Sequence, residues 1–216
     1  MFKIKRIEKL TLKEMMFNFE LYEGLPEGLG QLPCPTYIKI GMSYYHIPEN
    51  LKEFTDNLCY GQRIFLGHAE DEDFSTIVRI IDGYYYSIVT KQKWDADKAL
   101  LFGKKVLTCK VNELYPTTMH LASLIKEMTD REQELLHREP SKLELAAGIE
   151  KLTVFAELNA LDFLRDAMKI TVPEVLLTPY NECLVRFMIA KETMEFQERH
   201  FNIQMETAKA KSKKTQ

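Results

Sequence analysis

Apolar residues recur at helical spacing along much of this chain, and the longest such stretch runs from Ser141 to Met168. Leu145, Ile149 and Leu152 recur at steps of four and three residues, which is the period of one helix face, and Leu158, Leu161, Leu164 and Met168 continue the stripe. Ser141 and Glu144 have the form of an N-terminal capping box, and Pro140 lies just outside it. Because only a narrow polar side remains, the pattern is typical of a helix enclosed by other elements. We therefore predict one buried helix over 141–168 at the centre of the core.

The same period predicts further helices on both sides of this segment. Thr11 and Glu14 form a second capping box in front of a short helix. A helical pattern also occupies 56–82 and ends at Asp82-Gly83. The remaining predicted helices are a short one capped near Asp95 and ending at Phe102, a long one that Pro116 opens and whose charged end over 130–139 lies in water, one turn over 173–177, and a final helix that Pro179 starts.

A period of two residues is found only near the N-terminus. The β-prone runs 37–40 and 43–46 flank Gly41-Met42, so the sequence predicts a small β-hairpin there. Residues 51–55 fit either a short strand or the start of a helix. The glycines and prolines of 24–35 do not match a nucleotide-binding fingerprint, and they predict a connecting loop.

Together these patterns predict a mainly α fold (α+β), in which a helical domain surrounds the central buried helix and a small β-hairpin region precedes it. In domain terms, residues 1–55 form a small α+β region and residues 56–205 form the helical domain. Residues 206–216 combine four lysines with no apolar anchor. We therefore predict that this last segment is a disordered basic tail.

Composition narrows the choice of partner. With 45% hydrophobic and 28% charged residues, the 216-residue chain is typical of soluble globular proteins. Its net charge of −3 disfavours general binding to nucleic acid, which needs a clustered positive surface. Core packing is favoured over base stacking for the aromatic run 84–86, because only Lys91 and Lys93 stand near it. No apolar run is long enough to cross a bilayer, and the N-terminal stretch lacks a signal-peptide core. We expect a cytoplasmic protein with no nucleic-acid or membrane partner.

Few residues are arranged for catalysis. The four cysteines share no C-x-x-C spacing, so we expect them to be reduced and mostly buried. The histidines are scattered, and His120, on an apolar helical stretch, is expected to be a hydrogen-bonded core residue. Cys59 or Cys109 would be a nucleophile only if the fold brought a histidine close to it. We expect no catalytic residue and no cofactor.

The acidic run from Glu70 to Asp73 has two interpretations. It could hold a divalent cation, although it lacks the glycine and the closing glutamate of an EF-hand loop. Acidic residues also suit a helix N-terminus, where they face the positive end of the helix dipole. The second interpretation is favoured, and we expect no metal site.

Methionine is the most suggestive residue type, because it lies beside phenylalanine on and near the last two predicted helices. Flexible thioethers next to aromatic rings suit a surface that repacks around a partner, and they also fill cores. Core filling is favoured for Met168 and Met188, whereas both interpretations stay open for 194–205. The candidate partner-binding residues are Phe187, Met194, Phe201 and Met205.

The chain resembles small proteins encoded in the tail-morphogenesis regions of bacteriophages and prophages. The segments that carry the resemblance are 47–55 with 60–63, 111–116, and 147–155 leading to the helix start at 179–180. The resemblance implies a tail assembly chaperone, a helical protein that holds the aggregation-prone tape-measure protein before the tail polymerises. It also implies a location in the host cytoplasm, a second phage protein as partner and possible homo-oligomerisation.

Three functional hypotheses follow. The first is a non-enzymatic assembly chaperone that acts through apolar, methionine-rich surfaces. The second is a structural virion protein, such as a connector or a packaged internal protein. The third is an enzyme whose site is assembled from dispersed residues. The first is favoured, and the presence or absence of the protein in purified particles separates the first two.

Overall fold

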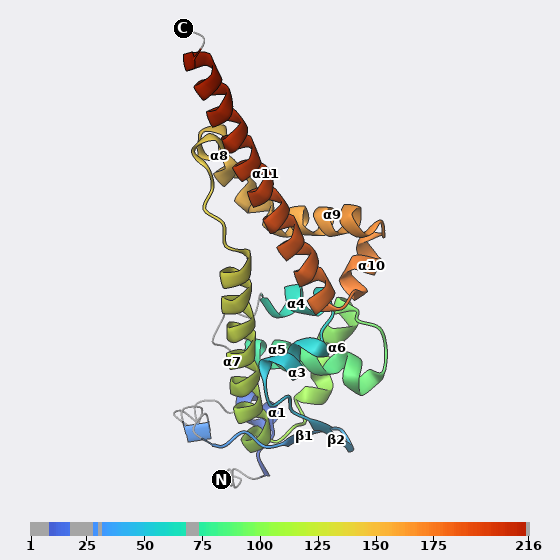
Figure 1. The fold of residues 1–216 in the computed structure, drawn as a ribbon. Helices are drawn as coiled ribbons and strands as arrows, with labels where there is room; N and C mark the ends of the chain where they lie inside the picture. The colour runs from blue at the N-terminus through green and yellow to red at the C-terminus, as the bar shows by residue number, and fades with distance from the viewer. Residues whose placement is uncertain (1–8, 18–27, 30–31, 68–73, 215–216) are drawn as a thin grey trace.

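The computed structural model describes residues 9–17, 28–29, 32–67 and 74–214. Within these residues the chain is mainly helical with a two-stranded antiparallel sheet, which confirms the predicted fold class (Figure 1). The elements of the first half are α1 (Leu12–Phe17), β1 (Tyr37–Ile40), β2 (Ser43–His46), α3 (Leu51–Asp56), α4 (Tyr60–Gly67), α5 (Phe74–Thr90) and α6 (Ala96–Val106). Those of the second half are α7 (Val111–Leu136), α8 (Lys142–Ala147), the 3-10 helix η3 (Ile149–Phe155), α9 (Ala156–Met168), α10 (Val172–Leu177) and α11 (Tyr180–Lys214).

Helix α5 packs against α4, α6 and α7, and none of its described side chains is exposed. All three tyrosines of its aromatic run are buried, as core packing predicts. The Tyr84 ring stacks on Phe54 with centroids 5.1 Å apart, and the Tyr85 hydroxyl donates to the carbonyl oxygen of His46 at 3.1 Å. The core around α5 also includes Leu10, Leu12 and Met15 from the N-terminal region, so one apolar cluster spans the predicted 1–55 region and the helical domain.

The predicted helix end at Asp82-Gly83 is wrong, because α5 continues without a break to Thr90. Gly83 allows close packing here: a Cβ at this position would lie 2.5 Å from Leu66 Cδ2 of α4. The continuous helix carries the Asp82 carboxyl into the core beside Gly103 of α6. Neither carboxyl oxygen has a hydrogen-bond partner among the described residues. Burial raises the pKa of Asp82 to about 8.

The predicted central helix over 141–168 is also wrong. The capping box at Ser141 and Glu144 is present, but Gly148, with φ of 81°, ends α8 after two turns. The 3-10 helix η3 and then α9 follow it, and Leu164 is the one buried residue among the side chains described in this segment. Its other described large apolar side chains are half-buried or exposed rather than enclosed. Those exposed by more than half are Leu152, Val154, Phe155 and Leu158.

Where local chemistry defines an element, sequence and structure agree. The hairpin has the predicted strands, with Ile40 paired to Ser43 across the turn. Asp95 caps α6 by accepting from the Lys98 backbone N–H at 3.1 Å. The segment 51–55 is a helix rather than a strand, and α11 begins directly after Pro179. Helix α7, however, begins at Val111, so Pro116 lies inside it instead of opening it.

Helix α11 runs past α9 and α8, and its C-terminal end extends beyond them (Figure 1). It continues to Lys214, through most of the segment for which the sequence predicts a disordered tail. The sequence there is rich in alanine, lysine and glutamate, which favour helix. Leu184 is the last buried residue of α11 among the described side chains, and we call the part of the helix after it the projecting part.

Candidate partner-binding groove

The projecting part of α11 carries large apolar side chains without burying any of them. Beyond Leu184, each described side chain is either exposed or half-buried. The large apolar residues that are exposed there are Val185, Ile189, Met194, Phe196, Phe201, Ile203 and Met205. So many apolar side chains exposed on one helix indicate an interaction surface.

These residues form two stripes on opposite sides of α11, because each residue turns the helix by about 100°. The inner stripe faces α7, α8 and α9, and the outer stripe faces away from them. The inner stripe consists of Phe187, Met194, Phe201 and Met205. The outer stripe consists of Val185, Ile189, Phe196 and Ile203.

Contacts at its base fix the direction of the inner stripe. The Phe187 ring stacks on Phe163 of α9 at 5.5 Å between centroids and lies 6.1 Å from the Tyr60 ring of α4. On the same side, Lys191 Nζ donates to the carbonyl oxygen of Leu135 at 3.0 Å. Phe187 is therefore half-buried and is shared between core packing and the surface.

Three hollows, all lined by described residues, follow one another along the inner stripe. The first, of about 240 Å³, lies between α4, α7, α9 and the start of α11, and Phe187 is part of its wall. The second, of about 290 Å³, extends from Phe187 to Met194. The third, of about 330 Å³, extends from Met194 past Phe201. Neighbouring hollows share Phe187 or Met194 as a lining residue, and we call the three hollows together the inner groove.

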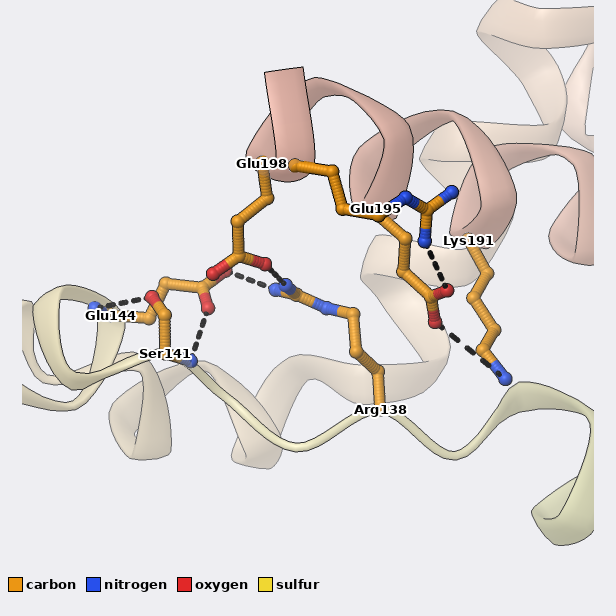
Figure 2. A network of polar contacts seen from close by, with 7 residues as sticks. Arg138, Ser141, Glu144, Lys191, Glu195 and Glu198 are labelled. Carbon is orange, nitrogen blue, oxygen red and sulfur yellow. Dashed lines mark hydrogen bonds and ion pairs between the residues drawn. The ribbon is translucent and has the colours of Figure 1, made fainter. Parts of the chain in front are cut away.

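Arg138 forms the wall of the groove opposite α11. Its guanidinium makes a hydrogen-bonded ion pair with Glu144 of α8 and a second one with Glu198 of α11 at 3.2 Å (Figure 2). Glu144 also accepts from the Ser141 backbone N–H at 2.8 Å. These hydrogen bonds, first from Ser141 and then from Arg138, lower the pKa of Glu144, so its carboxylate stays charged at neutral pH. One arginine thus ties the connector after α7 to both α8 and α11.

A second charge pair closes the base of the groove. Arg63 of α4 donates from Nε to the two carboxylate oxygens of Glu132 at 2.9 and 3.1 Å. The predicted exposed end of α7 is therefore wrong at Glu132, whose side chain is only 12% exposed. Burial raises the pKa of the neighbouring Tyr60 to about 12, so its hydroxyl stays protonated. This end of the groove combines aromatic rings with a neutralised ion pair, which suits an apolar occupant.

The residues considered for chemistry lie elsewhere. Cys109 and Cys183 are buried and Cys59 is half-buried, while Cys34 is exposed. Burial raises the pKa of Cys109 and Cys183 to about 12, which disfavours the nucleophilic thiolate. His120 Nε2 donates to the carbonyl oxygen of Pro48 at 2.7 Å, so its predicted hydrogen bond is confirmed, although the residue is half-buried.

Metal ligation was considered at the acidic run 70–73, which lies outside the described residues. Within the described part of the chain, no three histidine, cysteine, aspartate or glutamate side chains are grouped to hold a metal ion.

None of the described helices combines the length and the apolar character that a membrane span requires.

The structure places three of the four predicted partner-binding residues in the inner groove and the fourth beyond it. Phe187, Met194 and Phe201 line the inner groove, and Met205 lies one turn farther along the same stripe. Helical spacing was the signal for this set. The same spacing marks the outer stripe. Its residues were not predicted from the sequence, because three of the four are aliphatic and none is methionine. Comparisons of the chain with protein families, with curated proteins and with solved structures find no match.

Proposed function

We propose that this protein is a non-enzymatic assembly factor that holds an apolar helical segment of another protein in its inner groove. The observation that carries the proposal is the groove itself. It runs along α11 from Leu184 to Asn202, about 27 Å at 1.5 Å per residue, and its walls are mainly apolar. That length matches about five turns of a bound helix, which would lay its apolar side in the groove.

The shape of the groove favours a segment over a small molecule. The groove consists of three partly open hollows that follow one another along one helix, rather than one enclosed cavity. The charged groups on its walls are already paired within the chain, at Arg63 with Glu132 and at Arg138 with Glu144 and Glu198. Binding an apolar segment in the groove would therefore not separate any of these charged side chains from the residue it pairs with.

The resemblance to phage tail assembly chaperones supplies the proposed partner, the tape-measure protein, and the proposed location, the host cytoplasm. A chaperone of this kind needs an apolar surface that is accessible before the tail polymerises. The inner stripe provides one, and its thioethers at Met194 and Met205 can adapt to more than one sequence.

Co-production with the tape-measure protein of the same genome tests the proposal. The double substitution Met194→Asp with Phe201→Asp puts two charges in the groove, so at least about tenfold less tape-measure protein should remain soluble and copurify. Gln204→Asp is the matched control, since Gln204 is exposed on α11 between the two stripes. Equal capture by all variants, with circular dichroism showing intact helices, would refute the proposal.

A second candidate function is a structural virion protein. It is favoured by the apolar side chains exposed on η3 and α9, which add a second patch beside the groove. These are Leu152, Val154, Phe155 and Leu158. Permanent neighbours in a particle would cover both surfaces. Mass spectrometry of purified particles separates the two functions, because an assembly chaperone is absent from the finished particle and a structural protein is present in it.

A further inference from the structure

We propose that the outer stripe is the site at which a second copy of this chain docks, through antiparallel pairing of the two α11 helices. Ile189, Phe196 and Ile203 follow one another at steps of seven residues. A seven-residue repeat keeps one seam of a helix facing a second helix over several turns. Val185 lies one turn before Ile189 on the same side, and all four side chains are more than half exposed.

The surface at the seam is shaped to accept side chains. A shallow depression of about 500 Å³ runs over the first half of the outer stripe, from Val185 to Phe196. Its lining is almost entirely apolar, with Glu192 and Thr193 at the edge. The apolar side chains of a facing helix would fill this depression, as knobs fill the holes of a helix pair.

The charged residues of the outer stripe indicate both which partner docks there and in which direction its helix runs. Glu192 and Arg199 occupy the seam between the apolar residues, also seven positions apart. In a parallel pair each of them would face its own copy, so like charges would be opposed. In an antiparallel pair Glu192 of each copy faces Arg199 of the other, which gives two equivalent ion pairs. The stripe is thus complementary to itself in one orientation, as a two-fold interface requires.

The apolar residues agree with the same alignment. An antiparallel pairing in which position 192 faces position 199 places Ile203 of one copy beside Ile189 of the second copy. It also brings the two Phe196 rings next to each other at the middle. Since α11 rises about 1.5 Å per residue, the stripe from Val185 to Ile203 gives about 27 Å of continuous contact.

The shape of the molecule permits this arrangement. The body lies at the N-terminal end of α11, and the helix projects from it (Figure 1). Antiparallel pairing places the two bodies at opposite ends of the helix pair.

This self-association is independent of the proposed function, because it uses the opposite side of α11. Met194→Asp changes the inner groove and should leave self-association intact, whereas Phe196→Asp changes the seam and should leave the inner groove intact. A chain that captures its partner but stays monomeric refutes the self-association alone. A chain that dimerises but captures nothing refutes the proposed function alone.

Sedimentation velocity of the full chain over a range of concentrations tests the proposal. The wild type should form a reversible dimer, and Phe196→Asp should be monomeric under the same conditions. Glu192→Arg alone and Arg199→Glu alone should each raise the dimer dissociation constant at least about tenfold, because each opposes like charges. The double variant with both changes should restore the wild-type constant, since the ion pairs are re-formed with reversed sign.

The charge swap makes the direction of pairing measurable. Rescue by the double variant occurs only if position 192 of one copy faces position 199 of the other. A dimer that both single variants leave unchanged, a double variant without rescue, or a wild-type chain that remains monomeric at every concentration would each overturn the proposal. Circular dichroism of each variant shows whether a lost dimer reflects a lost fold.

Discussion

Replacing Asp82 with asparagine should change the way in which the stability of this protein depends on pH. The Asp82 side chain is fully buried, and its two oxygens have no hydrogen-bond partner among the described residues. Burial raises the pKa of this carboxyl from 3.8 to about 8. Asp82→Asn keeps the shape of the side chain and removes its ionisation, so any pH-dependent difference between the two proteins reports on this one group.

The direction in which stability changes with pH follows from the protonation of Asp82 in the folded and in the unfolded chain. Below about pH 4, Asp82 is protonated in both the folded and the unfolded chain, so its contribution to stability does not vary with pH. Between about pH 4 and pH 8 the unfolded chain releases the proton and the folded chain retains it. Stability therefore falls as pH rises, by about 1.4 kcal/mol per pH unit, and the loss is complete above the folded pKa. Asp82→Asn abolishes this slope.

The magnitude is large enough to measure directly. From pH 5 to pH 7 the free energy of unfolding of Asp82→Asn should gain about 3 kcal/mol relative to the wild type. Domains of this kind are stable by only about 5–15 kcal/mol, so the divergence of the two curves should be clear. The difference between variants removes the contribution of all other titrating groups, including the histidines.

Urea denaturation at pH 5, 6 and 7, followed by circular dichroism, is the assay. Asp130→Asn is the matched control, because the Asp130 side chain is 59% exposed and the same charge is removed from the surface. That control should shift stability by no more than about 0.5 kcal/mol at any of these pH values. Parallel stability curves for Asp82→Asn and the wild type would refute the assignment of a buried, protonated carboxyl.

Two further predictions concern packing and charge near α4. Gly83→Ala should destabilise the fold by about 1 kcal/mol or more, because the new Cβ lies 2.5 Å from Leu66 Cδ2, and the cost of such a clash exceeds the gain in helix propensity. Gly28→Ala is its control, since no atom lies within 4 Å of the new Cβ there; equal urea midpoints for the two variants would contradict the packing argument. Glu132→Gln should cost about 3 kcal/mol in the same assay, because it leaves Arg63 charged and largely enclosed, and a loss below about 1 kcal/mol would mean that the pair behaves as a surface ion pair.

Elements defined by local chemistry were predictable from the sequence. The glycine-containing pair between two β-prone runs was enough for the hairpin at 37–46, and Asp95 and Pro179 marked two helix starts. In each case the signal and the structure it specifies lie within a few residues of each other. Such signals do not depend on which other element packs nearby.

Burial was not predictable in the same way. The apolar period over 141–168 was read as the core helix, but Gly148 interrupts it and most of its apolar side chains are exposed. The buried helix is α5, whose Asp82-Gly83 pair has the form of a helix end. Gly83 stands there because α4 approaches closely, and a sequence pattern does not reveal that approach.

The candidate site was partly predictable. Helical spacing brought Phe187, Met194 and Phe201 together on one stripe before the groove was known. The groove walls were not foreseen, because Arg138 reaches Glu198 across 60 residues of sequence and Arg63 reaches Glu132 across 69. Pairing at such separations is a property of the fold, and no local pattern encodes it.

Photo-crosslinking from single positions of α11 tests most directly the claim that the inner groove holds another protein. A photoreactive amino acid is placed at 194, 196 or 204 in the full chain, which is produced together with the tape-measure protein. Position 194 is expected to crosslink to an apolar segment of the tape-measure protein, and position 196 to a second copy of this chain, while position 204 gives little of either product. A tape-measure crosslink that forms from 196 or 204 but not from 194 would contradict the account.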